Sequence, residues 1–166
     1  MDARQFGLGI VLMLVFMAMQ AGWLPFGSMN LLIGAVVFVV VMYLIGKGVM
    51  AKPSAEMKEL WMFSSALVLV ITVIALFVAP LIPGLVVPTD MTAFGALLMS
   101  LWMFVFGGAM FVTGWTEKWG VTTLVGILWL FGGLHLSLPF VAQNGYIHFG
   151  LLVGLPFIIY GLMSKK

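Results

Sequence analysis

The chain has 166 residues, of which 64% are hydrophobic and 7% are charged. Soluble globular domains carry about 25% charged residues, so this composition excludes a water-soluble fold and intrinsic disorder. Cysteine is absent, which excludes disulfides, thiolate metal sites and cysteine nucleophiles. The sequence therefore predicts an all-α integral membrane protein that forms a single domain over residues 1–166.

The charged residues divide the chain into four uncharged stretches, residues 5–46, 60–89, 91–116 and 119–164. A transmembrane helix needs about 20 apolar residues, so the first and last stretches are each long enough for two helices. Turn-forming residues interrupt both stretches, at Pro25-Phe26-Gly27-Ser28 and at Gln143-Asn144-Gly145. We therefore expect a bundle of six transmembrane helices, at about 6–22, 29–46, 60–82, 92–114, 120–141 and 146–163.

The basic residues all fall on one side of this expected topology. With six spans, both termini and the loops after the second and fourth helices lie on the same side of the membrane. That side holds every Lys and Arg of the chain, namely Arg4, Lys47, Lys52, Lys58, Lys118, Lys165 and Lys166. Because basic loops stay in the cytoplasm, we expect both termini to be cytoplasmic and the protein to be a multi-pass protein of the cytoplasmic (inner) membrane. The positive charges thus have a topological explanation and predict no nucleic-acid partner.

Polar side chains within the expected helices are the candidate solute-binding residues, because such groups are costly inside a membrane. One group lies at the outer level and comprises Gln20, Asn30, His135, Ser137 and His148. The deeper hydroxyl groups are those of Ser64, Ser65, Thr72 and Ser100. Together they predict a polar outer vestibule that leads into an apolar passage. In the alternative interpretation, the hydroxyls bond to helix backbones, and Gln20 and Asn30 clamp the first two helices together.

Motifs of enzymes and nucleotide-binding proteins are missing. The chain contains no Walker loop, no Gly-x-Gly-x-x-Gly, no His-Glu-x-x-His and no Gly-x-Ser-x-Gly. We therefore expect no enzymatic activity, no catalytic residue, no metal site and no cofactor. The glycines, among them Gly150 and Gly154, Gly107-Gly108 and Gly132-Gly133, predict close packing between helices.

Four short motifs occur in a characteristic order along the chain. Phe6-Gly7-Leu8 opens the first helix, Phe63-Ser64-Ser65 lies in the third, and Leu101-Trp102 precedes a Phe-rich run in the fourth. Ile147-His148-Phe149-Gly150, followed by Gly154, opens the sixth. In order and spacing these motifs resemble those of the acetate–succinate uptake transporter (YaaH-type) family over nearly the full chain. The Asn-Pro-Ala-Pro segment of that family's amino-terminal signature is missing.

The resemblance implies a homo-oligomer, typically a hexamer, with one pore through the six helices of each protomer. The implied function is a channel or proton-coupled transporter for small monocarboxylates such as acetate, so the expected partners are the lipid bilayer and a small organic acid. By spacing, Val11 and Ala66 take the positions at which the family narrows its pore with an aromatic residue and a Tyr, and Phe16 is a further candidate for the constriction. His135 stands where family members carry an apolar residue.

Other interpretations of the same sequence stay open. Met29-Asn30-Leu31-Leu32-Ile33-Gly34 and the six-helix plan resemble, more distantly, the urea and amide channels, although the termini of those channels face outward. His135 and His148, at similar depth on consecutive helices, are also compatible with a haem-binding membrane subunit. A structural subunit of a larger membrane complex is the third alternative.

For a monocarboxylate transporter we expect uptake to rise as the outside becomes more acidic, because a protonated histidine attracts the anion.

Overall fold

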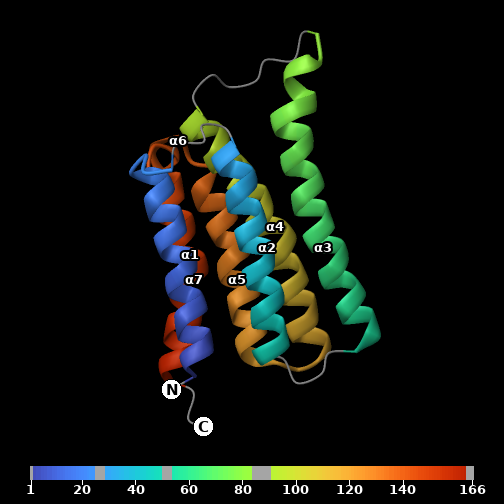
Figure 1. Cartoon of the computed structure of the whole chain (residues 1–166). Coiled ribbons are helices and arrows are strands. Elements are labelled where there is room, and N and C mark those ends of the chain that lie inside the picture. The colour runs from blue at the N-terminus through green and yellow to red at the C-terminus, as the bar shows by residue number, and fades with distance from the viewer. Residues whose placement is uncertain (1, 25–28, 50–53, 84–90, 164–166) are drawn as a thin grey trace.

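The computed structural model describes residues 2–24, 29–49, 54–83 and 91–163, and every regular element within these residues is a helix (Figure 1). The long helices are α1 (Ala3–Gln20), α2 (Met29–Val49), α3 (Ala55–Val73), α4 (Met91–Thr116), α5 (Gly120–Leu136) and α7 (Gly145–Met163). α3 continues into the π-helical turn η1 (Ile74–Val78) and the 3₁₀ turn η2 (Ala79–Leu81), and α6 (Pro139–Ala142) is a single turn. The predicted all-α class is confirmed for these residues.

The helices have the length and composition of membrane spans. Four helical stretches within the described ranges are long and apolar enough to cross a membrane: Ala3–Gln20, Ala55–Leu81, Ala93–Thr116 and Gly145–Met163. Two further apolar stretches are shorter, Met29–Leu44 and Gly120–Leu136. These helices are compatible with a multi-pass membrane protein, whereas the count of six spans stays a prediction.

Capping side chains decide where two of the helices begin. The Asp2 carboxylate accepts hydrogen bonds from the backbone N–H groups of Arg4 (3.1 Å) and Gln5 (3.4 Å). The Ser54 hydroxyl accepts one from the N–H of Met57 (3.4 Å). The first N–H groups of a helix have no partner within it, so such caps stabilise the first turn. Both helices therefore begin earlier than the expected positions 6 and 60.

A proline decides where the fifth helix ends. α5 stops at Leu136, before the expected position 141, and Ser137 is its C-cap. Pro139 has no backbone N–H, and its ring pushes the preceding residue out of the helical conformation. Leu138 accordingly has an extended backbone, with φ −75° and ψ 130°. The expected single helix over 120–141 is therefore two helices, of which the second is the short α6.

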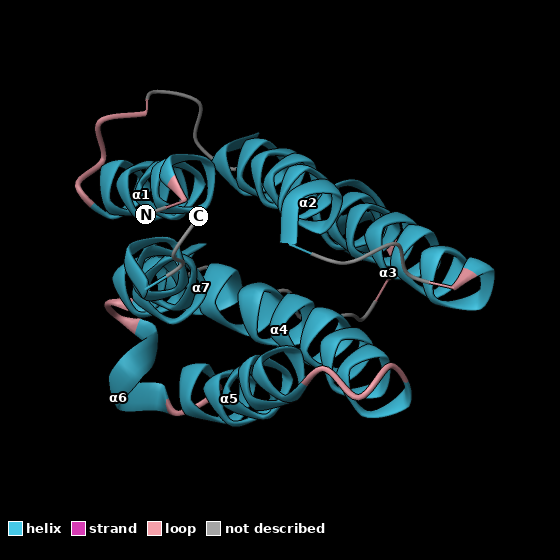
Figure 2. Cartoon of the chain, turned by 90° about the horizontal axis from the view of Figure 1, so that it is seen from below, coloured by secondary structure: helices cyan, strands magenta, loops and turns pink. Residues whose placement is uncertain are grey.

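Two pairs of helices pack with their backbones close together, α1 with α7 and α4 with α5 (Figure 2). A Cβ atom at Gly126 would overlap the backbone of Phe111, and one at Gly9 would lie 2.7 Å from the carbonyl oxygen of Gly154. Glycines at these positions let the helix backbones approach, which provides van der Waals contact between helices in lipid. Other close contacts of this kind are made by Gly107, Gly114, Gly133 and Gly161.

Hydrogen bonds from two tryptophans join α3 to α4. The indole Nε1–H of Trp61 donates to the hydroxyl of Thr113 (3.0 Å), and that of Trp102 donates to the hydroxyl of Thr72 (3.0 Å). A buried indole N–H needs an acceptor, and these two threonines provide it. α3 is therefore fixed to the bundle at two heights, although it lies at the edge of the molecule (Figure 2).

An aromatic cluster fills the centre of the bundle. It consists of six side chains with no exposed surface: Phe16, Phe38, Trp102, Phe106, Trp129 and Phe149. The ring centroid of Phe38 lies 5.0 Å from that of Phe106, 5.3 Å from that of Phe149 and 5.9 Å from that of Trp129. Phe16 contacts Phe149 at 4.6 Å. Helices α1, α2, α4, α5 and α7 thus meet in one set of ring contacts.

The close approach of α4 and α5 predicts that Gly126→Ala destabilises the protein. The added methyl group meets backbone atoms of Phe111 that cannot move aside, so we expect a loss of about 1–3 kcal/mol, the usual cost of overpacking. Thermal unfolding in detergent, followed by circular dichroism, measures the change. Gly108→Ala is the matched control, because a Cβ there has no neighbour within 4 Å. Equal midpoints for the two variants would contradict the glycine-mediated contact.

Candidate functional site

The two ends of the bundle differ in their polar groups. At one end, where α1 begins and α7 ends, the N–H of Asp2 donates to the carbonyl of Gly161 (2.6 Å). The guanidinium of Arg4 donates to the carbonyl of Leu44 (2.8 Å) at that end. At the opposite end, the side chain of Gln20 donates to the carbonyl of Gln143 (3.0 Å). We call the first the basic end and the second the polar end.

A histidine pair joins α5 to α7 at the polar end. Nε2 of His135, in the last turn of α5, lies 3.2 Å from Nδ1 of His148, in the first turn of α7. The ring centroids are 5.0 Å apart, the interplanar angle is 62°, and both side chains are partly buried. In such a bond one ring nitrogen donates and the other accepts, so at least one of the two rings is neutral. A second proton would remove the acceptor and place two positive charges side by side, and the contact is therefore sensitive to protonation.

The side-chain carboxamides of Gln20 and Asn30, at the polar end, form only part of the hydrogen bonds that they are able to form. The NH₂ group of Gln20 bonds to Gln143, and that of Asn30 donates to the carbonyl of Leu24 (3.0 Å). The other half of each carboxamide, Oε1 of Gln20 and Oδ1 of Asn30, is buried and has no hydrogen-bond partner among the described residues. The NH₂ group of Gln20 thus joins α1 to the turn before α7, and that of Asn30 bonds to the connection between α1 and α2. The expected clamp between the first two helices is compatible with the bond of Asn30, whereas Gln20 bonds elsewhere. The two oxygens stay available as acceptors.

Most of the predicted hydroxyl residues bond to the helix backbones. Ser65 donates to the carbonyl of Trp61 (2.8 Å), Thr72 to that of Val68 (2.7 Å), and Ser100 to that of Gly133 (2.6 Å). At the polar end, Ser137 is exposed and donates to the carbonyl of Leu134 (2.7 Å). Ser64 is buried, with 3% of its surface exposed. The bond from Ser100 crosses between α4 and α5, so this hydroxyl contributes to helix packing.

The three residues expected at a constriction lie in different surroundings. Phe16 is fully buried and belongs to the aromatic cluster. Val11 is 44% exposed, and Ala66 is exposed as well. These two side chains therefore lie on outer faces of α1 and α3 in this structure, away from Phe16. A role for Val11 and Ala66 in narrowing a pore stays a prediction from the resemblance.

Gln5 is a buried polar residue that we did not single out in the sequence. Its side chain has no exposed surface, and neither Nε2 nor Oε1 has a hydrogen-bond partner among the described residues. It lies at the basic end, on the same face of α1 as the buried Gly9, Leu12 and Phe16. This spacing of four, seven and eleven residues is the signal that could have identified it, because residues so spaced share one helix face.

Metal binding finds no support in the described part of the chain, which contains no group of three or more His, Cys, Asp or Glu side chains able to hold an ion. The chain matches no protein-family model, no curated protein and no solved structure. The resemblance to acetate–succinate uptake transporters therefore rests on the sequence motifs. The candidate site rests on the geometry of the histidine pair and on the unpartnered carboxamide oxygens of Gln20 and Asn30.

The two unpartnered atoms of Gln5 predict that Gln5→Leu raises the thermal unfolding midpoint. Leucine fits a similar volume and removes polar atoms whose burial without partners costs about 1–3 kcal/mol. Thr72→Val is the control and should lower the unfolding midpoint, because it removes the acceptor of the Trp102 indole N–H. A lower midpoint for Gln5→Leu would show instead that the carboxamide holds a partner in the membrane.

Proposed function

We propose that the protein is a proton-coupled membrane transporter for small monocarboxylates such as acetate. In this proposal the chain crosses the cytoplasmic membrane six times with both termini inside, so the polar end faces outward. The observation that supports it best is the 3.2 Å contact between His135 and His148. These are intramembrane ionisable groups that touch each other, and such groups are typical of proton relays and solute pathways. The resemblance supports the solute class and a homo-oligomer, with a hexamer as the expected size.

The aromatic cluster favours a gated carrier over a permanently open channel. Five helices contribute fully buried rings to it, and Phe38 alone contacts four other rings at centroid distances of 5.0–6.2 Å. A carboxylic acid cannot pass rings in van der Waals contact, so transport requires them to separate. Lids and packed interfaces that open in response to a bound solute are common in transporters and enzymes.

The polar end has the chemistry to recognise a carboxylic acid. Protonation of the histidine pair breaks its internal hydrogen bond, and the resulting imidazolium donates to a carboxylate instead. The buried oxygens of Gln20 and Asn30 accept from the O–H of the neutral acid, which gives these atoms the partner they lack. The solute then crosses together with the proton, and the histidines return to their mutual contact.

The first prediction from this mechanism concerns the pH dependence of uptake. In proteoliposomes, uptake of labelled acetate by the wild type is expected to increase as the outer pH falls, because protons release the histidine pair. His135→Ala and His148→Ala are each expected to flatten this dependence, since neither variant can form the pair. Ser137→Ala is the control, because its exposed hydroxyl bonds only to the neighbouring turn. Identical pH profiles for all four proteins would remove the histidines from the mechanism.

A second prediction concerns the closure of the interior. Phe38→Ala removes the ring that contacts four members of the aromatic cluster, so we expect acetate flux with a weaker pH dependence and leakage of larger solutes such as succinate. Val36→Ala on the exposed face of the same helix is the control. If liposomes with Phe38→Ala leak succinate no faster than liposomes with the wild type, the result would argue against a gate at this position.

The same preparations distinguish the alternatives. A urea or amide channel would conduct urea regardless of the histidine substitutions. A structural subunit would show no flux and would co-purify with partner proteins. A bis-histidine haem holds its flat macrocycle between two imidazoles, whereas His135 and His148 contact each other directly, so this arrangement does not favour haem.

A further inference from the structure

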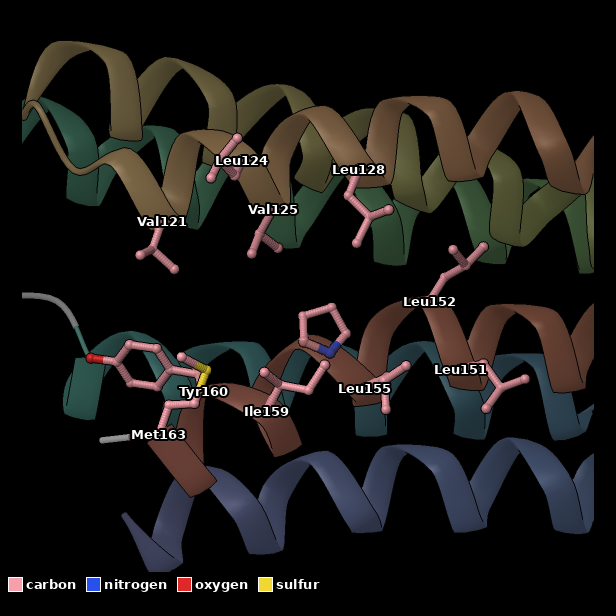
Figure 3. A pocket seen from close by; sticks show the side chains of 11 residues that line it. Val121, Leu124, Val125, Leu128, Leu151, Leu152, Leu155, Ile159, Tyr160 and Met163 are labelled. Atoms are coloured by element: carbon pink, nitrogen blue, oxygen red, sulfur yellow. The ribbon is translucent and has the colours of Figure 1, made fainter. Parts of the chain in front are cut away.

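α5 and α7 touch in their outer halves and separate in their inner halves. The histidine pair joins them at the polar end, and the indole of Trp129 donates to the carbonyl of Leu152 (3.0 Å) near the middle. Pro156 explains why this carbonyl is free, because proline has no N–H to donate four residues back along the helix. Between this bond and the basic end, the two helices enclose an open groove of about 660 Å³ (Figure 3).

The lining of this inner groove is almost entirely aliphatic. α5 contributes Val121, Val125 and Leu128, and α7 contributes Leu152, Leu155 and Ile159. Figure 3 shows these side chains along the gap between the two helices. In a membrane such a surface gains van der Waals contacts from the apolar group that packs into it, which is either an acyl chain or another helix.

The length of the groove favours an acyl chain. From Val121 to Leu128, α5 rises by about 10 Å, and from Leu151 to Met163, α7 rises by about 18 Å. These lengths match one leaflet of the hydrocarbon core, which is about 15 Å thick, and fall short of the full core of about 30 Å. A transmembrane helix from a second copy would need a groove along the whole bundle, but the contacts at the polar end close it there.

The basic end of the groove carries groups that suit a phosphate. The exposed Lys118 lies three residues before Val121, in the turn that leads into α5. The first turn of α5 has no side-chain cap, so its N–H groups and positive dipole face the same region. The hydroxyl of Tyr160 points toward this end of the groove (Figure 3). The neighbouring Glu117 carboxylate accepts a hydrogen bond from the N–H of Ser54 (3.1 Å), so Lys118 and the start of α5 are the groups that match a phosphate. Together with the apolar groove they match the two parts of one anionic phospholipid.

We propose that the inner groove binds an anionic phospholipid, with one acyl chain between α5 and α7 and the phosphate beside Lys118 and the start of α5. The assignment of this lipid to the cytoplasmic leaflet rests on the proposed topology. Binding of the lipid is independent of which solute the protein transports.

Native mass spectrometry of the purified full chain, with phosphatidylglycerol or phosphatidylcholine added to the detergent, tests this site. The wild type is expected to retain phosphatidylglycerol more strongly than phosphatidylcholine. Leu128→Trp and Leu155→Trp fill the groove and should weaken retention of both lipids about tenfold, because the acyl chain loses its van der Waals contacts with the groove. Lys118→Gln should abolish the preference for phosphatidylglycerol and leave phosphatidylcholine retention unchanged.

Leu134→Trp is the matched control, because this side chain is 54% exposed on α5 and does not line the groove. Circular dichroism confirms that each variant is folded. If one of the two groove variants does not fold, the other, on a different helix, still tests the groove. Retention by both groove variants equal to that of Leu134→Trp would overturn the proposal. A change in oligomeric mass without a change in lipid retention would also overturn it, in favour of an interface with a second copy.

Discussion

The contacts of the Phe38 ring are the constraint on which the rest of this structure depends. One side chain of α2 touches aromatic rings of α4, α5 and α7, and through Phe149 it is linked to Phe16 of α1. Close-packed rings have no room for independent motion, so no two of these helices can separate without disturbing the ring contacts of the others. The glycine-mediated pairs, α1 with α7 and α4 with α5, are too tightly packed to open within themselves. Movement is therefore expected between the pairs.

The hydrocarbon environment explains how the buried polar groups are used. Water cannot reach the middle of a membrane, so each freed carbonyl and each indole N–H needs a partner from a neighbouring helix. The bond from Trp129 to Leu152 meets this need beside a proline, and the bond from Trp102 to Thr72 meets it between α3 and α4. Among the described residues, both polar atoms of the Gln5 carboxamide and the carboxamide oxygens of Gln20 and Asn30 are buried without such a partner.

The sequence predicted the helices well, because charges, turn residues and the length of apolar stretches are local signals. It placed His135 well inside a fifth helix that runs to residue 141, whereas His135 lies in the last turn of α5, because this helix ends at Leu136. It could not show that the rings of His135 and His148 touch, which depends on the relative rotation of α5 and α7. It could not identify the buried faces either, because lipid-facing and core-facing residues are equally apolar. Val11 and Phe16 are both apolar, but Val11 is 44% exposed and Phe16 is fully buried. The glycines singled out in the sequence did indicate interfaces: a Cβ at Gly150 or Gly154 would meet atoms of α1, whereas one at Gly108 would have no neighbour within 4 Å.

The bond from the Trp129 indole to the Leu152 carbonyl has a mechanical consequence. It joins α5 and α7 between the histidine pair on one side and the inner groove on the other. If one of these helices tilts relative to the other while this bond is kept, the helices rotate about the position of the bond. A tilt that separates His135 from His148 brings the inner halves of α5 and α7 together and narrows the inner groove. Conversely, a lipid chain bound in the groove opposes this tilt and keeps the two histidines in contact.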